Sequence, residues 1–236
     1  MFEHLHQAMR AHAVEAYPNE AVGAVIDGEY IRLENVAENP QETFCVDMEA
    51  FIAAHGDADV QAIVHSHPDG PNHPSEADMR QAAAWGVPWG IILCDGTGWA
   101  GDPFFWGEGV PVPALEGRTF RHGVTDCYAL VRDWFKLERG IDLPDLPRTD
   151  EWWTKGGNIL EEHYAAFGFE RIDPKDVQPG DCFLMCIRAR NANHSGVFVE
   201  DGQILHHLPN RVSRREHYAR WGGMLHSVLR YTGAKA

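Results

Sequence analysis

Three side chains in the first half of the sequence have the types and spacing needed to hold a metal ion. His65 and His67 lie two residues apart in VQAIVHSH, a predicted strand, so both imidazoles point to the same side of it. Ser75 is a good N-cap, which places Asp78 on the first turn of the following helix. Two histidines and one carboxylate are a common three-ligand zinc set that leaves a fourth position open for water. The pattern therefore predicts a catalytic zinc (Zn2+) site.

A zinc hydrolase also needs a base that takes a proton from water and passes it to the leaving amine. Glu20 is the candidate, because it precedes AVGAVI, a predicted strand that could lie beside the strand of the histidines. Simpler interpretations exist for each part. A single His-x-His is often two surface histidines, and Ser75 with Asp78 could form only a helix cap. The combination, rather than any one residue, indicates chemistry.

A second cluster, in the other half of the sequence, could provide nucleophilic catalysis. Cys127 lies just inside a predicted helix, 126–139, where the helix dipole and free N–H groups favour a thiolate. His194 opens the predicted strand HSGVFVE and could accept the proton of the thiol. The alternative for Cys127 is a buried core cysteine. We expect that simpler role for the remaining cysteines, Cys45, Cys94, Cys182 and Cys186.

The third member of such a triad depends on the turn after this strand. A strict two-residue Asp-Gly hairpin at 201–202 would bring His207 to the face of His194. A three-residue loop or a bulge would shift the parity and select His206 instead. The residues alone leave both histidines open.

The elements that must position these residues follow from periodicity and turn signals. Helices are predicted at 2–16, 47–55, 75–85, 126–139 and 158–167, and strands at 21–26, 30–36, 60–67, 89–94, 182–189, 194–200 and 203–207. Each half mixes helices and strands without a repeat, which predicts an α+β fold. The stretch 105–117 is rich in Gly and Pro, and we place a linker at 107–117 between domains at 1–106 and 118–236.

The composition restricts the partners. The chain has 236 residues and a formal net charge of −15, so nucleic acid and anionic membranes should repel it. No apolar stretch approaches the ~20 residues of a membrane helix, and no signal peptide is visible. Five cysteines argue against a complete disulfide framework. We expect no membrane insertion, no nucleic-acid binding and synthesis in the cytoplasm without export by the usual route.

The first half resembles the JAMM/MPN+ metallopeptidases over roughly residues 1–105. Glu20, His65-Ser66-His67, seven residues, Ser75, two residues and Asp78 match that motif at every position. The resemblance implies a mixed sheet with helices, and His65, His67 and Asp78 as zinc ligands. It also implies Glu20 as the general acid/base and Ser75 as a group that helps to hold the oxyanion. Members of that family cleave peptide or isopeptide bonds next to small ubiquitin-like folds.

The second half, from about residue 118 to 235, resembles the NlpC/P60 cysteine peptidases, which are papain-like. Asp126-Cys127-Tyr128, QPGDCFLM and HSGVFVEDGQILHH carry the resemblance. It implies Cys127 as the nucleophile, His194 as the base and His206, twelve positions later, as the third residue. Those enzymes cut peptide bonds in bacterial peptidoglycan. The aromatic residue expected before the cysteine is not clearly matched, since Phe120 and His122 lie there instead.

The order of the two halves resembles the tail-assembly protein K family of lambda-like bacteriophages. That resemblance implies other tail-tip proteins as partners, peptidoglycan peptide as substrate, and a location in the host cytoplasm during assembly and then at the virion tail tip. Three functions follow as hypotheses. They are a peptidoglycan-cutting enzyme that uses Cys127, a zinc protease that processes a tail protein, and a structural tail-tip or scaffold component without catalysis.

Overall fold

The computed structural model describes residues 1–56 and 58–233. The chain divides into two compact units, Met1–Pro111 and Val112–Ala236. This division falls inside the predicted linker 107–117, and the functional bounds of the two domains stay a prediction. Among the described residues, no helix has both the length and the apolar character needed to cross a membrane.

The first unit is built around a five-stranded sheet with the order β2-β1-β3-β4-β5. Strands β3 and β4 are parallel and the other pairs are antiparallel, so the sheet is mixed. Its elements are a 3-10 turn at Glu3–Leu5, α1 (His6–Ala16), β1 (Val22–Ile26), β2 (Glu29–Leu33), α2 (Met48–His55), β3 (Val60–Pro68), α3 (Glu76–Trp85), β4 (Pro88–Cys94) and β5 (Phe104–Gly107).

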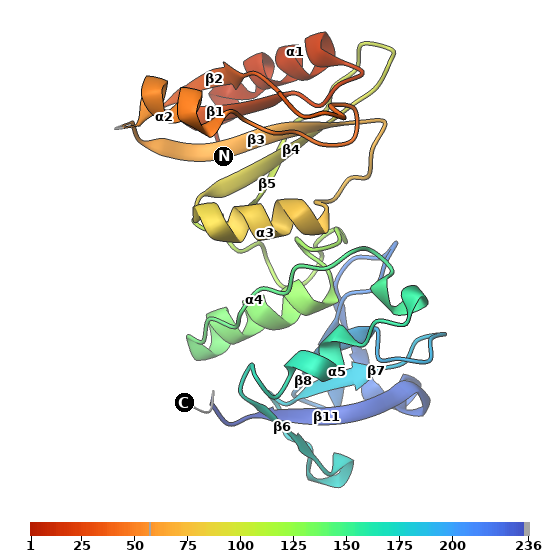
Figure 1. Cartoon of the computed structure of the whole chain (residues 1–236). Coiled ribbons are helices and arrows are strands. Elements are labelled where there is room, and N and C mark those ends of the chain that lie inside the picture. Colours follow the sequence, from red (N-terminus) through yellow and green to blue (C-terminus); the bar gives the residue numbers. More distant parts are fainter. Residues whose placement is uncertain (57, 234–236) are drawn as a thin grey trace. The chain divides into compact units, whose positions relative to one another are not determined.

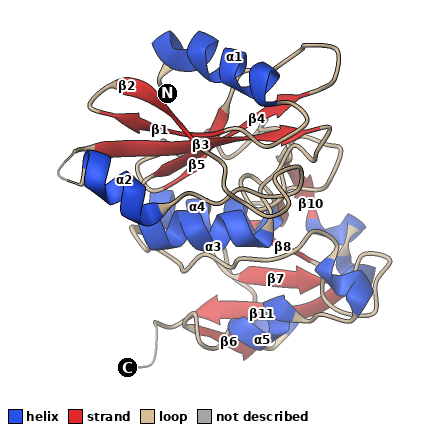
Figure 2. Ribbon diagram, turned by 45° about the horizontal axis from the view of Figure 1, so that its top comes forward, coloured by secondary structure: helices blue, strands red, loops and turns tan. Residues whose placement is uncertain are grey.

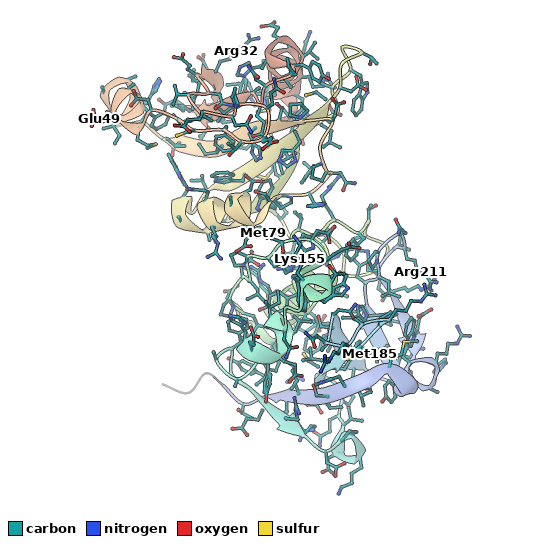
Figure 3. The ribbon with its side chains drawn as sticks, turned by 45° about the vertical axis from the view of Figure 1, so that its right-hand side comes forward. Arg32, Glu49, Met79, Lys155, Met185 and Arg211 are labelled. Atoms are coloured by element: carbon teal, nitrogen blue, oxygen red, sulfur yellow. The ribbon has the colours of Figure 1, made fainter. Side chains whose placement is uncertain are left out.

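Helices cover both faces of this sheet. Figure 1 shows α1 on one side of the strands and α3 on the other. Met9 and Ala13 of α1 pack in one apolar cluster with Val25, Val64 and other buried residues of the strands. Residues of β3 alternate between the faces, so His65 and His67 lie on the face opposite Val64. The charged residues Arg32 and Glu49 are exposed and lie at the periphery of the unit (Figure 3).

The second unit contains a six-stranded antiparallel sheet with the order β10-β9-β8-β7-β11-β6. Figure 2 shows β7, β11 and β6 side by side. Helix α4 packs on β8 and β9 through a cluster that includes Leu130, Trp134 and Leu205. The elements are α4 (Cys127–Arg139), α5 (Ile159–His163), β6 (Phe169–Ile172), β7 (Cys182–Met185), β8 (His194–Val199), β9 (Gln203–His206), β10 (Arg214–His217) and β11 (Leu225–Tyr231), with 3-10 turns at Trp152–Lys155, Pro174–Asp176, Tyr218–Arg220 and Gly222–Met224.

The predicted α+β class with two domains is confirmed, with several differences in detail. The helix predicted at 158–167 is short, Ile159–His163, and the strand predicted at 182–189 ends at Met185. β5 begins at Phe104 and extends to Gly107, into a stretch that looked like linker from its Gly and Pro content. Four strands were missed, namely β5, β6, β10 and β11. β10 reads RREH, a polar edge strand without any apolar alternation to reveal it.

Candidate active sites

The three predicted metal ligands meet at one point of the first unit. His65 Nε2 lies 3.1 Å from His67 Nε2, and it lies 3.5 Å from Asp78 Oδ1. His67 Nε2 lies 3.7 Å from Asp78 Oδ2. All three residues are buried, and one ligand atom from each lies within 4.8 Å of the others. The structure therefore brings together side chains that come from β3 and from the first turn of α3.

Neighbouring groups fix the orientation of His67 and Asp78. His67 Nδ1 donates a hydrogen bond to the carbonyl of Pro71 at 2.9 Å, which leaves Nε2 with its lone pair toward the other two ligands. Asp78 Oδ2 accepts hydrogen bonds from the Ser75 amide at 2.7 Å and from the Ser75 hydroxyl at 2.8 Å. The amide of Asp78 donates back to Ser75 Oγ at 3.1 Å, which completes a capping box at the start of α3.

This donor set fits zinc. Two imidazole nitrogens bound to one tetrahedral Zn²⁺, each at ~2.0–2.1 Å, are about 3.3 Å apart. The two Nε2 atoms lie 3.1 Å apart here, which is close to that separation. Burial raises the pKa of Asp78, but the hydrogen bonds with His65 and His67 lower it more, so the net shift is downward and the carboxylate is ionised. Burial lowers the pKa of His65, which keeps its imidazole neutral and able to bind a metal.

Glu20 lies beside this cluster. It directly precedes β1, which is paired with β3, and Ala21 exchanges hydrogen bonds with Ser66 at 2.8 and 2.9 Å. Glu20 is buried, and this burial raises its pKa to about 7. The charges of His67 and Asp78 act on the same carboxyl group in opposite directions. A carboxyl group with a pKa near neutrality can both accept and return a proton, as a general acid/base must.

The Ser75 hydroxyl is already used within the cluster. Its single proton is donated to Asp78 Oδ2. The structure therefore shows Ser75 as the residue that orients a ligand and caps α3. Its predicted contact with an oxyanion stays a prediction, and it would require the hydroxyl to turn away from Asp78.

In the second unit, Cys127 is the first residue of α4, as predicted. Asp126 is the N-cap and accepts hydrogen bonds from the amides of Tyr128 and Ala129 at 3.1 and 3.0 Å. The expected thiolate is not supported. Burial, together with the adjacent charge of Asp126, raises the pKa of the Cys127 thiol to about 11. Burial is the larger cause and the negative charge of Asp126 is the second, and together they outweigh the effect of the helix N-terminus. The Asp126 side chain also takes up the free N–H groups of Tyr128 and Ala129.

Asp126 is itself held in a buried ion pair. Arg148 donates to Asp126 Oδ2, and His122 Nδ1 lies 3.7 Å from the same oxygen. His122 also donates from Nε2 to the carbonyl of Arg148 at 3.1 Å. Phe120 packs edge-on against His207 with ring centroids 5.1 Å apart. His122, one of the two residues near the unmatched aromatic position, thus belongs to the support of the α4 N-cap.

A line of hydrogen bonds crosses three adjacent strands of this unit. His194 Nε2 of β8 lies 3.0 Å from His206 Nδ1 of β9, and His206 Nε2 lies 3.0 Å from Glu216 Oε2 of β10. His194 and His206 are buried. Helix α4 packs against β8, and the charge of Asp126 acts on the His194 imidazole, so that imidazole is within electrostatic reach of the α4 N-terminus. Sequence reasoning missed Glu216, because a single glutamate in a polar strand gives no signal.

The β8–β9 loop decides which of the two neighbouring histidines faces His194. Val199 pairs with Gln203, so three residues form the loop, and Gly196 pairs with His206. Residues on one face of paired strands alternate, which puts His206 on the face of His194. His207 points elsewhere, and its Nε2 donates to the carbonyl of Arg211 at 3.0 Å. Arg211 is exposed and lies at the periphery of the second unit (Figure 3).

Gly196 allows Phe183 to pack closely beside His194. A Cβ atom at position 196 would lie 2.5 Å from the Phe183 ring and 2.6 Å from the carbonyl oxygen of Leu205. The ring centroids of Phe183 and His194 are 5.9 Å apart. Glycine is therefore needed for this packing, which confines the imidazole on one side.

Comparisons with known proteins give one family for each half of the chain. The family model described as prokaryotic homologs of the JAB domain matches residues 2–106, and that of the NlpC/P60 family matches residues 101–230, more than half of the chain. Tail tip assembly protein K of Escherichia phage lambda is 38% identical over 189 residues, which cover 80% of this chain and 90% of that protein. The chain belongs to the tail tip assembly protein K family.

Two further relatives extend this result. Tail tip assembly protein K of Escherichia phage N15 is 34% identical over 239 aligned positions, which cover 95% of this chain and 93% of that protein. A protein of Thermus thermophilus named "Probable TtuB-protein conjugate cleaving protease" is 33% identical over 97 residues, 37% of this chain and 65% of that protein. The alignment with the phage N15 protein thus includes both units of this chain.

Proposed function

We propose that this chain is a phage tail-tip assembly protein with two hydrolytic centres, a cysteine peptidase that cuts peptidoglycan peptides and a zinc-dependent peptide or isopeptide hydrolase. The observation that carries the first activity is the line His194–His206–Glu216 next to the helix that begins with Cys127. In such an arrangement the second imidazole and the carboxylate can orient the first imidazole, His194, so that it acts as a base.

In the cysteine centre, the raised pKa of Cys127 determines how the reaction begins. The thiol is neutral at rest, so its proton passes to His194 as Sγ attacks the carbonyl carbon of the peptide bond. His194 then gives this proton to the leaving amine, and an acyl-enzyme remains on Sγ. Water, deprotonated by the same imidazole, hydrolyses the thioester and restores the thiol.

In the first unit, His65, His67 and Asp78 would hold zinc, which supplies a Lewis acid for the activation of water and the polarisation of a carbonyl. Glu20 would accept the proton of the attacking water on its carboxylate and deliver it to the leaving amine. Ser75 would hold Asp78 in place through its hydroxyl group. The match to the JAB family, and the relative named as a conjugate-cleaving protease, favour a protein substrate for this centre.

Processing of another tail protein is therefore the second candidate function. A purely structural role in the tail tip is the third, and the intact ligand and triad sets argue against it. The acidic charge of −15 suits tail-tip protein partners better than nucleic acid or membrane. We place the protein in the host cytoplasm during assembly and then at the tail tip of the virion, where it would meet the cell wall.

Digestion of purified sacculi by wild type, Cys127→Ser and His65→Ala tests this proposal. We expect wall fragments from wild type and from His65→Ala but none from Cys127→Ser. The zinc content should be about one ion per chain in wild type and Cys127→Ser, and should be lost in His65→Ala. If wild type leaves the wall intact but trims a tail protein in a zinc-dependent manner, the peptidoglycan assignment is wrong and the second candidate replaces it.

A further inference from the structure

Glu216 is held as an ionised carboxylate by three donors. Its Oε2 atom faces Trp221 Nε1 at 3.0 Å and His206 Nε2 at 3.0 Å, and its Oε1 atom faces Arg214 at 2.6 Å. The tryptophan and arginine groups can only donate hydrogen bonds. Burial raises the pKa of the Glu216 carboxyl group, but the hydrogen bond with His206 and the charge of Arg214 lower it more, so the group is ionised. Its side chain is only 10% exposed.

The charge of Glu216 fixes where the protons of the two histidines lie. Glu216 accepts, so His206 Nε2 carries a hydrogen and donates it. In a neutral imidazole the other nitrogen is then an acceptor, so His206 Nδ1 must receive a hydrogen bond. Its partner at 3.0 Å is His194 Nε2, which therefore carries a hydrogen. The remaining nitrogen, His194 Nδ1, keeps a lone pair and can act as a base.

We propose that Glu216 is a positioning residue that acts through His206 to hold His194 in the tautomer with a free Nδ1 lone pair. This inference rests on the proposed cysteine peptidase function. When the Cys127 proton moves to His194 Nδ1, the imidazolium still donates from Nε2 to His206 Nδ1. Glu216 keeps its charge throughout and stabilises the positive charge along the line.

The alternative arrangement shows why a carboxylate is needed. Without it, His206 could carry its hydrogen on Nδ1 and donate toward His194 Nε2. His194 would then have to carry its own hydrogen on Nδ1, where it cannot take the thiol proton. Other charged and titratable groups also act on the two histidines. Arg214 and Arg211 act on His206. His207 and Asp126 act on His194. Of the two carboxylates among these groups, Glu216 accepts a hydrogen bond from the His206 imidazole, and Asp126 acts on His194 only through its charge.

The test is ¹⁵N NMR of the histidine side chains in the full chain, which needs no substrate. In wild type we expect both His194 and His206 with hydrogen on Nε2 and not on Nδ1. Glu216→Gln preserves the shape but can offer its amide hydrogens to His206, so the reversed tautomer should become populated. The pH midpoint for protonation of the His194–His206 pair should also fall by about one unit, because the Glu216 carboxylate no longer stabilises the positive charge.

Activity provides a second measurement. The kcat on sacculi should fall at least about tenfold in Glu216→Gln with KM unchanged, while Glu200→Gln, an exposed glutamate in the β8–β9 loop, should behave as wild type. A wild-type His194 with hydrogen on Nδ1 would overturn the inference, as would Glu216→Gln with wild-type tautomers and midpoint. If wild type does not cut sacculi but the tautomers are as stated, the substrate assignment fails and the role of Glu216 stands.

Discussion

Burial shifts the pKa of an ionisable side chain upward at each of the two sites, with different consequences. Glu20 has a pKa of about 7, which suits proton transfer at neutral pH. Cys127 has a pKa of about 11, which leaves a neutral thiol that needs a base during the attack itself. The same physical cause, removal of charge-stabilising water, thus tunes one residue toward its proposed role and makes the other depend on its neighbours.

Replacing Glu20 by Gln should stabilise the metal-free protein at alkaline pH. The folded-state pKa of about 7 lies above the ordinary value of 4.5, so the stability linked to this proton is complete below about 4.5 and is lost as the pH rises through about 7. At about pH 8 the gain in the free energy of unfolding should approach roughly 3 kcal/mol, and near pH 4.5 it should vanish. Urea denaturation with a chelator at both pH values measures this, with the exposed Glu38→Gln as control.

The alkylation rates of Cys45 and Cys127 should differ because the two thiols differ in exposure and in pKa. Exposed Cys45 should react with iodoacetamide at about pH 8 at least ~10-fold faster than Cys127, because a thiol with a pKa of about 11 is almost wholly protonated there. Peptide mass spectrometry after timed quenching separates the two sites. In denaturant the two rates should become similar, and faster labelling of Cys127 in the folded chain would mean that it is a thiolate after all.

At the scale of elements, a short local motif with a defined geometry positions part of each site. The capping box of α3 holds Asp78, and the three-residue β8–β9 loop selects His206. β10, an edge strand, adds Glu216 next to His206 through the pairing of Arg214 with His206. Each site therefore depends on one local motif and on one or two long-range strand pairings.

Ser75→Ala should separate the two roles of the capping box. Loss of the N-cap should cost about 1 kcal/mol of unfolding free energy, and loss of the hydrogen bond to Asp78 should weaken zinc binding by about 10- to 100-fold. Thermal denaturation and competition with a zinc chelator measure these effects, and Ser75→Thr, which keeps the hydroxyl, is the matched control. Unchanged zinc affinity together with reduced stability would leave Ser75 as a helix cap only.

At the scale of the whole molecule, the chain consists of two compact units with separate apolar clusters and separate candidate sites. The three candidate zinc ligands all lie in the first unit, and the Cys127 cluster lies in the second. Ligand binding stabilises only the folded state that contains the site.

Zinc should therefore raise the unfolding temperature of one unit alone. At 100 times the dissociation constant the gain is about 2.7 kcal/mol for the unit that binds, and none for the other. Differential scanning calorimetry with zinc and with a chelator should show one transition that moves and one that stays. The moving transition should become insensitive to zinc in His65→Ala and remain sensitive in Cys127→Ser. Two transitions that move together in wild type would contradict independent units.

The sequence alone determined much of this protein. His-x-His in a predicted strand and a Ser75 cap three residues before Asp78 are local patterns, and the periodicity of side chains fixes their directions without knowledge of the rest of the chain. The helix that begins at Cys127 and the mixed α+β character follow from the same kind of local signal. The family resemblance, which the comparisons confirm, rests on these short motifs.

The tertiary structure alone decided the features that depend on burial and on distant pairing. Desolvation gave Cys127 a protonated thiol, against the expectation from its place at a helix N-terminus, because the charge of Asp126 and the surrounding residues outweigh the helix dipole. The length of one loop fixed His206 rather than His207, and the pairing of β10 brought Glu216 to it from ten residues away. A pattern read along the chain contains neither the dielectric surroundings of a side chain nor the strand that lies next to it, and these quantities set the chemistry here.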